Sequence, residues 1–188
     1  MDINRAEIAI ANIIETFGGD LQSEGMRDTP KRAAKMFAEL LEGMQYTNEQ
    51  IAEKCSKCFE HVSHNDLVIV QDIPIFSLCE HHLALMYNMK VHVAYVPCGR
   101  VIGLSKIARI AQLVSKRFQL QERIGQDILE ILAYVLCTND IMVIVEGEHS
   151  CMTARGVKVA GARTKTSAIN GRFKKVLALR QEALALIK

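Results

Sequence analysis

The sequence predicts an α+β fold with an antiparallel sheet, and three observations carry this prediction. The first 60 residues have helical periodicity. From residue 67 onward, a pair of strands, a pair of helices and a further pair of strands follow one another, without the βαβ alternation of a parallel sheet. The chain has 188 residues, 49% of them hydrophobic and 23% charged, which is the size and composition of one globular unit. We therefore expect a helical extension over residues 1–60 and one domain over 61–188.

The extension contains three predicted helices. Apolar residues recur at helical spacing from Ile8 to Phe17, and Gly18-Gly19 ends that run. A second helix begins at Thr29-Pro30, since Thr caps helices and Pro suits the first helical position. Thr47 followed by Gln50 has the spacing of a capping box, which predicts a third, shorter helix.

The remainder alternates strands and helices in pairs. Strands are expected from residue 67 and over 89–96, where alternate residues face opposite sides of the sheet, with Val91, Val93 and Tyr95 on one side. Helices follow over 105–118 and 120–137, and then a strand over 141–149. The glycine-containing segment 153–171 predicts a hairpin, and residues 173–187 predict one amphipathic helix.

Composition narrows the class of function. There are 23 basic and 21 acidic residues, a formal net charge of +2, so bulk attraction to nucleic acid or to a membrane is not expected. The acidic residues near the N-terminus and the lack of a long apolar run there argue against a signal peptide or a membrane span. We expect a cytoplasmic protein whose six cysteines are thiols or metal ligands.

Two short polar clusters contain residues that bind metals. Cys79 and His82 are three positions apart in the run CEHH, a spacing that lets a thiolate and an imidazole reach one Zn²⁺ from a bend. Cys151 is a candidate third ligand, and such a Cys₂His site keeps a fourth position open for water. His81 and His149 flank these residues and suit proton transfer. The alternative is buried cysteines beside surface histidines, but the clustering favours a metal.

Basic residues indicate a phosphate ligand. Ser105, Lys106 and Arg109 lie at the expected start of a helix, where backbone N–H groups and the helix dipole favour anions; a solvated helix surface is the alternative. Between Ser150 and Gln181 there are no acidic residues and eight basic ones. That run suits a polyphosphate, a nucleic acid or an acidic surface of another subunit. Aromatic residues are only 5% of the chain, which weakens the nucleic-acid interpretation.

Other motifs are absent or unconvincing. The sequence has no P-loop, no P-C-x-x-C deaminase pattern and no H-E-x-x-H helix. Cys55, Cys58, His61 and His64 are all of ligand type, but ten consecutive residues lack the loop that brings zinc-finger ligand pairs together. We therefore interpret these four as one stripe of a helix.

Several stretches, in order along the chain, resemble GTP cyclohydrolase I. They are CEHH at 79–82, HVAYVP at 92–97, VIGLSKIAR at 101–109, QLQER at 119–123, EHSCMTARGV at 148–157 and TKTSAINGRF at 164–173. The resemblance begins at Asp28 and runs to about Phe173. It departs from the family pattern after CEHH, where Leu83-Ala84-Leu85-Met86 replaces the usual Leu-Leu-Pro-Phe.

The resemblance implies a tunnelling fold, with an antiparallel sheet and two helices on one face. Subunits of that family form rings, typically a ten-subunit toroid with active sites between subunits. The implied reaction converts GTP and water to formate and 7,8-dihydroneopterin triphosphate, the entry to folate or pterin synthesis. A zinc-activated water attacks C8 of guanine, with zinc held by Cys79, His82 and Cys151.

The family's motifs also imply roles for other residues. His149 is the proton donor near N7, while His81 and Ser105 assist ribose opening and rearrangement. The guanine edge is read by Gln121 and Glu122. The triphosphate is held by Lys106, Arg109 and Arg155, joined by Arg32 and Lys35 of a neighbouring subunit.

Two alternatives remain beside a cyclohydrolase. A related deazaguanine nitrile reductase uses a cysteine nucleophile without zinc, but its Glu-Ser-Lys-type signature is absent here. A silent, zinc-stabilised ring that serves as a binding scaffold is the other, and the presence of both His81 and His149 argues against it.

Overall fold

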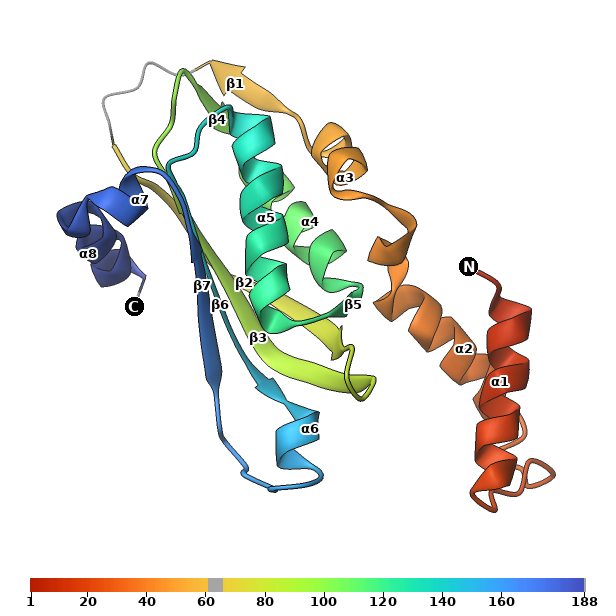
Figure 1. The fold of residues 1–188 in the computed structure, drawn as a ribbon. Coiled ribbons are helices and arrows are strands. Elements are labelled where there is room, and N and C mark those ends of the chain that lie inside the picture. The colour runs from red at the N-terminus through yellow and green to blue at the C-terminus, as the bar shows by residue number, and fades with distance from the viewer. Residues whose placement is uncertain (61–65, 188) are drawn as a thin grey trace.

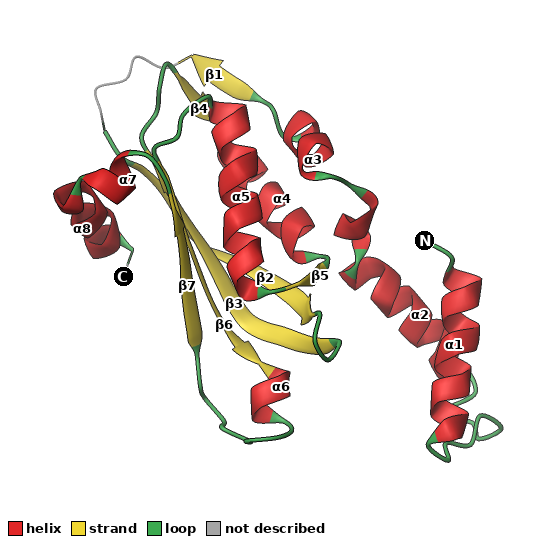
Figure 2. Cartoon of the chain, viewed as in Figure 1, coloured by secondary structure: helices red, strands yellow, loops and turns green. Residues whose placement is uncertain are grey.

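The computed structural model describes residues 1–60 and 66–187, which form an antiparallel-rich sheet with helices on both faces (Figures 1 and 2). The elements in chain order are α1 (Ile3–Thr16), α2 (Thr29–Leu40), the 3₁₀ helix η1 (Glu42–Gln45), α3 (Asn48–Lys54), β1 (Cys58–Glu60), β2 (Val68–Cys79), β3 (Ala84–Tyr95), β4 (Arg100–Ile102), α4 (Leu104–Ser115), β5 (Phe118–Gln119), α5 (Gln121–Leu136), β6 (Ile141–His149), α6 (Ser150–Thr153), β7 (Thr164–Ile169), α7 (Arg172–Lys175) and α8 (Leu177–Leu186). None of the helices in these two ranges combines the length and apolar character that crossing a bilayer requires.

The N-terminal helices follow the prediction closely. α2 begins at Thr29 with Pro30 in its first turn, and Thr47 closes the predicted capping box at α3. The Gln50 N–H donates to Thr47 Oγ1 (3.3 Å), and the Thr47 N–H donates to Gln50 Oε1 (3.0 Å). α1 packs beside α2, away from the sheet (Figure 1), and none of its residues is buried. Its apolar residues are therefore all at least partly exposed in the single chain.

The main sheet has the strand order β5-β2-β3-β6-β7. All its pairs are antiparallel except the short parallel contact of β5 with the end of β2. Because β5 covers only Leu78 and Cys79, the rest of β2 is an open edge. Pro74, which has no N–H, is tolerated there for that reason. β1 lies within the predicted extension, and it pairs with β4 in a separate two-stranded sheet.

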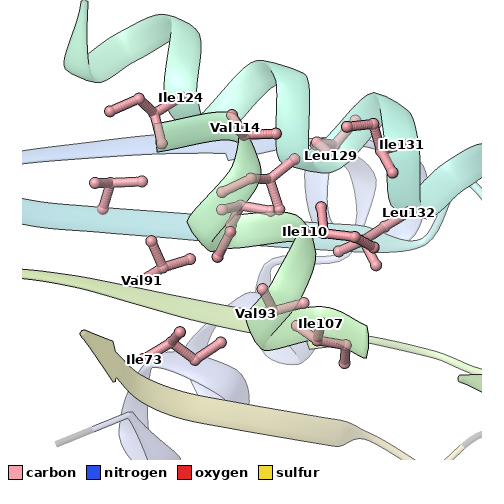
Figure 3. Packing of buried hydrophobic residues seen from close by; sticks show 14 of the residues in the cluster. Ile73, Val91, Val93, Ile107, Ile110, Val114, Ile124, Leu129, Ile131 and Leu132 are labelled. Atoms are coloured by element: carbon pink, nitrogen blue, oxygen red, sulfur yellow. The ribbon is translucent and has the colours of Figure 1, made fainter. Parts of the chain in front are cut away.

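The two faces of the sheet bury different apolar clusters. α4 and α5 cover one face, where Ile107, Ile110, Leu132 and other side chains pack on the sheet residues Val91 and Val93 (Figure 3). Phe173 of α7 and the apolar residues of α8 cover part of the opposite face. There they form a second cluster with Ala94 of β3 and Val96, which follows that strand. The predicted alternation along β3 is confirmed, since Val91, Val93 and Tyr95 belong to the first cluster and Ala94 to the second.

Three local predictions were wrong. Segment 153–171 forms no hairpin of its own: its first part includes the end of α6 and its last part is β7, which pairs with β6. The predicted last helix is interrupted at Val176, whose backbone is extended, and Arg180 satisfies carbonyls near the break by donating to those of Phe173 and Lys174. Cys58 lies in a strand, because α3 ends at Lys54.

Candidate metal centre and active site

Three ligand-type side chains converge at one end of the sheet. Cys79 is the last residue of β2, His82 lies in the turn between β2 and β3, and Cys151 is in α6 directly after β6. β3 pairs with both β2 and β6, so the ends of those strands meet on either side of it. One ligand atom from each residue lies within 4.8 Å of the others. The structure thus brings together the three residues predicted to bind zinc.

The donor set and its electrostatics fit a divalent metal. Burial, followed by the neighbouring Cys79 sulfur, raises the pKa of the Cys151 thiol above its ordinary value. Two sulfurs so close together cannot both ionise cheaply unless a cation compensates their charge. Thiolates and imidazole are the ligands that zinc prefers, whereas Mg²⁺ and Ca²⁺ prefer oxygen. Cys79, His82 and Cys151 are therefore suited to hold Zn²⁺ with a position left for another ligand.

Arg155 follows α6 and lies beside this cluster. Its Nη1 is 2.8 Å from His82 Nε2. This contact places a positive charge next to the candidate metal centre, and the phosphate-binding role of Arg155 stays a prediction.

His149, the last residue of β6, is held by Gln121 at the start of α5. The two side chains are joined at His149 Nε2 and Gln121 Oε1, 2.8 Å apart. Gln121 Nε2 donates to the carbonyls of Val145 (2.9 Å) and Thr164 (3.0 Å), so Oε1 must be the acceptor and His149 must donate from Nε2. Neutral His149 therefore carries its lone pair on Nδ1.

The surroundings of His149 favour its neutral form. Burial lowers the pKa of His149, and the negative charge of Glu122 partly opposes that effect. A lowered pKa means that the imidazole is mostly neutral at pH 7, and that its protonated form is a stronger acid than an ordinary imidazolium. Because Nε2 is engaged with Gln121, the second proton of the imidazolium resides on Nδ1.

Gln121, predicted to read the guanine edge, is buried between His149 and the backbone of β6 and β7. Gln121 is only 1% exposed. Both the oxygen and the nitrogen of its side-chain amide form hydrogen bonds with groups of the same chain. This geometry orients His149, and contact of Gln121 with a guanine edge stays a prediction. Glu122, the next residue, is exposed, and its negative charge is near enough to raise the pKa of His149. Val145 lies outside the motifs of the sequence analysis and Thr164 lies within one, but neither carbonyl could be identified as a partner of Gln121, because backbone acceptors carry no residue signature.

His81 is exposed in the turn that contains His82. The two rings are nearly perpendicular, at 81°, with centroids 6.4 Å apart. His81 therefore flanks the three ligand-type residues without joining their cluster.

The other predicted contacts with the sugar and triphosphate lie elsewhere in the chain. Ser105, Lys106 and Arg109 are in the N-terminal half of α4, whereas the far end of that helix, at Ser115, accepts a hydrogen bond from Ser77 Oγ near Cys79. Ten residues of helix correspond to about 15 Å. Arg32 and Lys35 are exposed on α2, and Arg32 donates to the Gly25 carbonyl and Thr29 Oγ1. One chain alone does not bring these five residues to the metal cluster.

The second cysteine–histidine cluster is only partly described. His61 and His64 lie outside the described residues. Cys55 is buried directly after α3, and Cys58 Sγ contacts the Val135 carbonyl at 3.6 Å. Burial raises the pKa of both thiols, which favours their neutral forms.

Comparison with known proteins points to one family. A family model described as GTP cyclohydrolase I matches residues 6–188. The chain is 52% identical to GTP cyclohydrolase 1 of Clostridium acetobutylicum over 192 residues and 50% identical to that of Clostridium beijerinckii over 193, in both cases covering 100% of this chain and 98% of the relative. It is 51% identical to the Clostridium botulinum (strain Loch Maree) protein of the same name over 178 residues, or 92% of this chain and 91% of the relative. Together with the cysteine–histidine cluster, these matches show that the chain belongs to the GTP cyclohydrolase I family.

Proposed function

We propose that this protein converts GTP and water to formate and 7,8-dihydroneopterin triphosphate in a zinc-dependent reaction, the first step towards folate or another pterin. The observation that carries the proposal is the convergence of Cys79, His82 and Cys151 beside a histidine of fixed tautomer, His149. Zinc, when bound, supplies a Lewis acid that lowers the pKa of its bound water to a value near neutrality, which suits attack at C8 of the guanine ring.

The chain's own residues supply substrate recognition and proton transfer. Glu122 accepts hydrogen bonds from N1–H and the 2-amino group of guanine, and Gln121 acts through His149. Adenine has neither the N1–H nor the 2-amino group, so the Glu122 carboxylate would be left unpaired. This disfavours ATP on the order of 10³-fold or more. His149 delivers its proton near N7 as the imidazole ring opens, and His81 and Ser105 assist the opening and rearrangement of the ribose.

The triphosphate contacts require more than one copy of the chain. Arg155 lies at the metal centre, but Ser105, Lys106 and Arg109 are at the far end of α4, and Arg32 and Lys35 are on α2. Copies of the chain that associate side by side bring these groups to the centre of a neighbour. The open edge of β2 supports such an association.

We further propose a tunnelling fold that assembles into a ten-subunit toroid. Residues 1–60 form its helical extension and residues 61–188 its catalytic unit. α4 and α5 on one face of the sheet support that assignment. Thiol ligands persist in a reducing compartment, which supports a cytoplasmic location.

The decisive experiment incubates the purified protein with GTP and measures formate together with a fluorescent pterin after oxidation. We expect both products in equal amounts, their loss with a chelator, and recovery when Zn²⁺ is added back. ATP serves as the matched nucleotide control. GTP turnover that persists after complete removal of metal would contradict the zinc-dependent mechanism.

A further inference from the structure

Three consecutive residues at the start of α5 each act on a different part of the candidate site. Gln121 bonds to His149, and the charge of Glu122 acts on the same imidazole. Arg123 instead reaches the turn after β2, where its side chain binds Glu80. The first turn of α5 therefore connects the proton donor, the residue proposed to read guanine, and the metal-ligand turn.

The contact between Arg123 and Glu80 has a defined geometry. Nη1 donates to Oε2 at 2.6 Å and Nη2 donates to Oε1 at 3.0 Å, so the guanidinium and the carboxylate meet through two bonds. Paired bonds of this kind fix orientation as well as distance. The backbone adds a second connection, because the Glu80 N–H donates to the Gln119 carbonyl at 3.1 Å, two residues before α5 begins.

Glu80 stands between Cys79 and His81, yet its carboxylate is not one of the three clustered ligands. The carboxylate instead points to Arg123, the residue after Glu122. A shift of this turn relative to α5 changes the distance between the metal ligands and the groups that hold guanine. The ion pair spans the two parts of the site whose separation matters for the reaction.

We propose that Glu80 and Arg123 are positioning residues, whose ion pair sets the placement of the Cys79–His82 turn relative to Glu122 and His149. This inference rests on the proposed function. Neither residue is given contact with the reacting atoms. Each acts through the neighbours that it holds.

A purely structural role for the pair predicts a different outcome. The side chains of Arg123 and Glu80 are 45% and 32% exposed, and solvent-exposed ion pairs contribute little to folding. Catalysis is far more sensitive to position, since small displacements of a reacting centre lower the rate steeply. Loss of the pair should therefore reduce turnover and metal affinity while leaving thermal stability nearly unchanged.

A double-mutant cycle on the full-length protein tests this proposal. E80Q, R123Q and the double variant E80Q/R123Q are compared with wild type for kcat, KM for GTP, zinc affinity and thermal midpoint. Zinc affinity is measured by competition with a chromophoric chelator. We expect each single change to lower kcat about 10–100-fold and to weaken zinc binding, as is typical for partners of metal ligands. The double variant should be no worse than the more impaired single variant, because the residues act only through each other.

The matched control is K90Q, which breaks the Lys90–Asp72 ion pair. That pair has a 2.7 Å contact and similarly exposed side chains, 48% and 46%, on the same sheet. K90Q should leave kcat and zinc affinity within about twofold of wild type, as for surface changes away from such features. R123K, which keeps the charge but loses the two-bond geometry, should remain impaired.

Three results would overturn the proposal: unchanged kcat and zinc affinity in E80Q, additive losses in the double variant, or a fall in thermal midpoint that exceeds that of K90Q. Failure of the proposed function has a separate signature. In that case wild type releases no formate from GTP, while the zinc affinities of the variants still test the ion pair.

Discussion

His149 donates from Nε2 to Oε1 of Gln121, and this one hydrogen bond fixes the tautomer of the candidate proton donor. The direction of this hydrogen bond follows from the other end of the Gln121 amide, because Gln121 Nε2 donates to the carbonyls of Val145 and Thr164. His149 is thereby oriented by a buried residue whose own partners are the backbone of β6 and β7. The neighbouring Glu122 is exposed.

Replacement of Gln121 by Met tests this orientation. Met conserves the volume but removes both the acceptor for His149 and the donor for the two carbonyls. We expect kcat to fall about 10–100-fold, part of the contribution of a positioned general acid, with bound zinc unchanged. Steady-state kinetics and metal analysis check the result. Wild-type turnover in Gln121→Met would remove the positioning role.

Cys151 is expected to be necessary for the metal. Cys151→Ala leaves one thiol and one imidazole, which is too few for a tight zinc site, so zinc should fall from about one per chain to a small fraction and turnover should be lost with it. Cys98→Ala is the control, since Cys98 is exposed in the turn after β3 and lies outside the cluster. Elemental analysis that finds a full zinc complement in Cys151→Ala would mean that the third ligand is misassigned.

Stability should rise with pH through the titration of His92. Burial lowers the pKa of His92 below 6.5. The negative charges of Asp72 and Glu146 oppose this decrease, and the positive charges of Lys90 and Lys165 add to it. Between the lowered folded value and 6.5 the unfolded state binds more protons than the folded state, so the free energy of unfolding increases with pH in that window and levels off above it. Below the pKa of His92 in the folded state, the stability gained by keeping this imidazole neutral is fully lost and the slope returns to zero.

The measurement is denaturant unfolding at a series of pH values from 5 to 8. His92→Gln removes the titrating group, so its stability curve should be flatter than that of wild type below pH 6.5. Burial also lowers the pKa of His149, which adds a slope of the same sign that remains in His92→Gln. Parallel curves for wild type and His92→Gln would show that His92 contributes nothing to the pH dependence.

Gly43 is expected to tolerate no side chain. A Cβ at this position would lie 1.9 Å from the Leu113 carbonyl oxygen and 2.8 Å from that of Lys116, both backbone atoms at the end of α4. Gly43→Ala should therefore destabilise the protein by about 2–3 kcal/mol. Gly25→Ala is the matched control, because no atom lies within 4 Å of its added Cβ. Equal unfolding midpoints for the two variants would contradict this close packing.

Gly125 should accept the same change with a gain. An added Cβ meets Ala168 Cβ at 3.5 Å and Val145 Cγ2 at 3.7 Å, which are ordinary contacts. Glycine inside a helix costs about 0.5–1 kcal/mol relative to alanine, so Gly125→Ala should raise the free energy of unfolding by about that amount. Thermal unfolding measures it, and a lower midpoint would show that α5 cannot approach β7 with the extra methyl group.

Local signals in the sequence were sufficient for most of the elements. Helix periodicity, the Thr47 capping box and the two-residue alternation of β3 all depend on residues near one another in the chain, so each could be predicted and is confirmed. The hairpin predicted over 153–171 was wrong because glycines and loose alternation do not show which strand a segment pairs with. β7 pairs with β6, and the residues between are α6 and a long connection.

By itself, the sequence determined the chemistry of the candidate site: thiol and imidazole side chains of ligand type at 79, 82 and 151, histidines beside them, and motifs in the order typical of one family. Only the tertiary structure decided which groups meet. β3 brings the ends of β2 and β6 together, Gln121 turns to His149, Arg123 turns to Glu80, and the basic residues of α4 lie a helix length away. Residue types fix what a side chain can donate or accept, but its partner depends on strand pairing and helix packing between segments far apart in the chain.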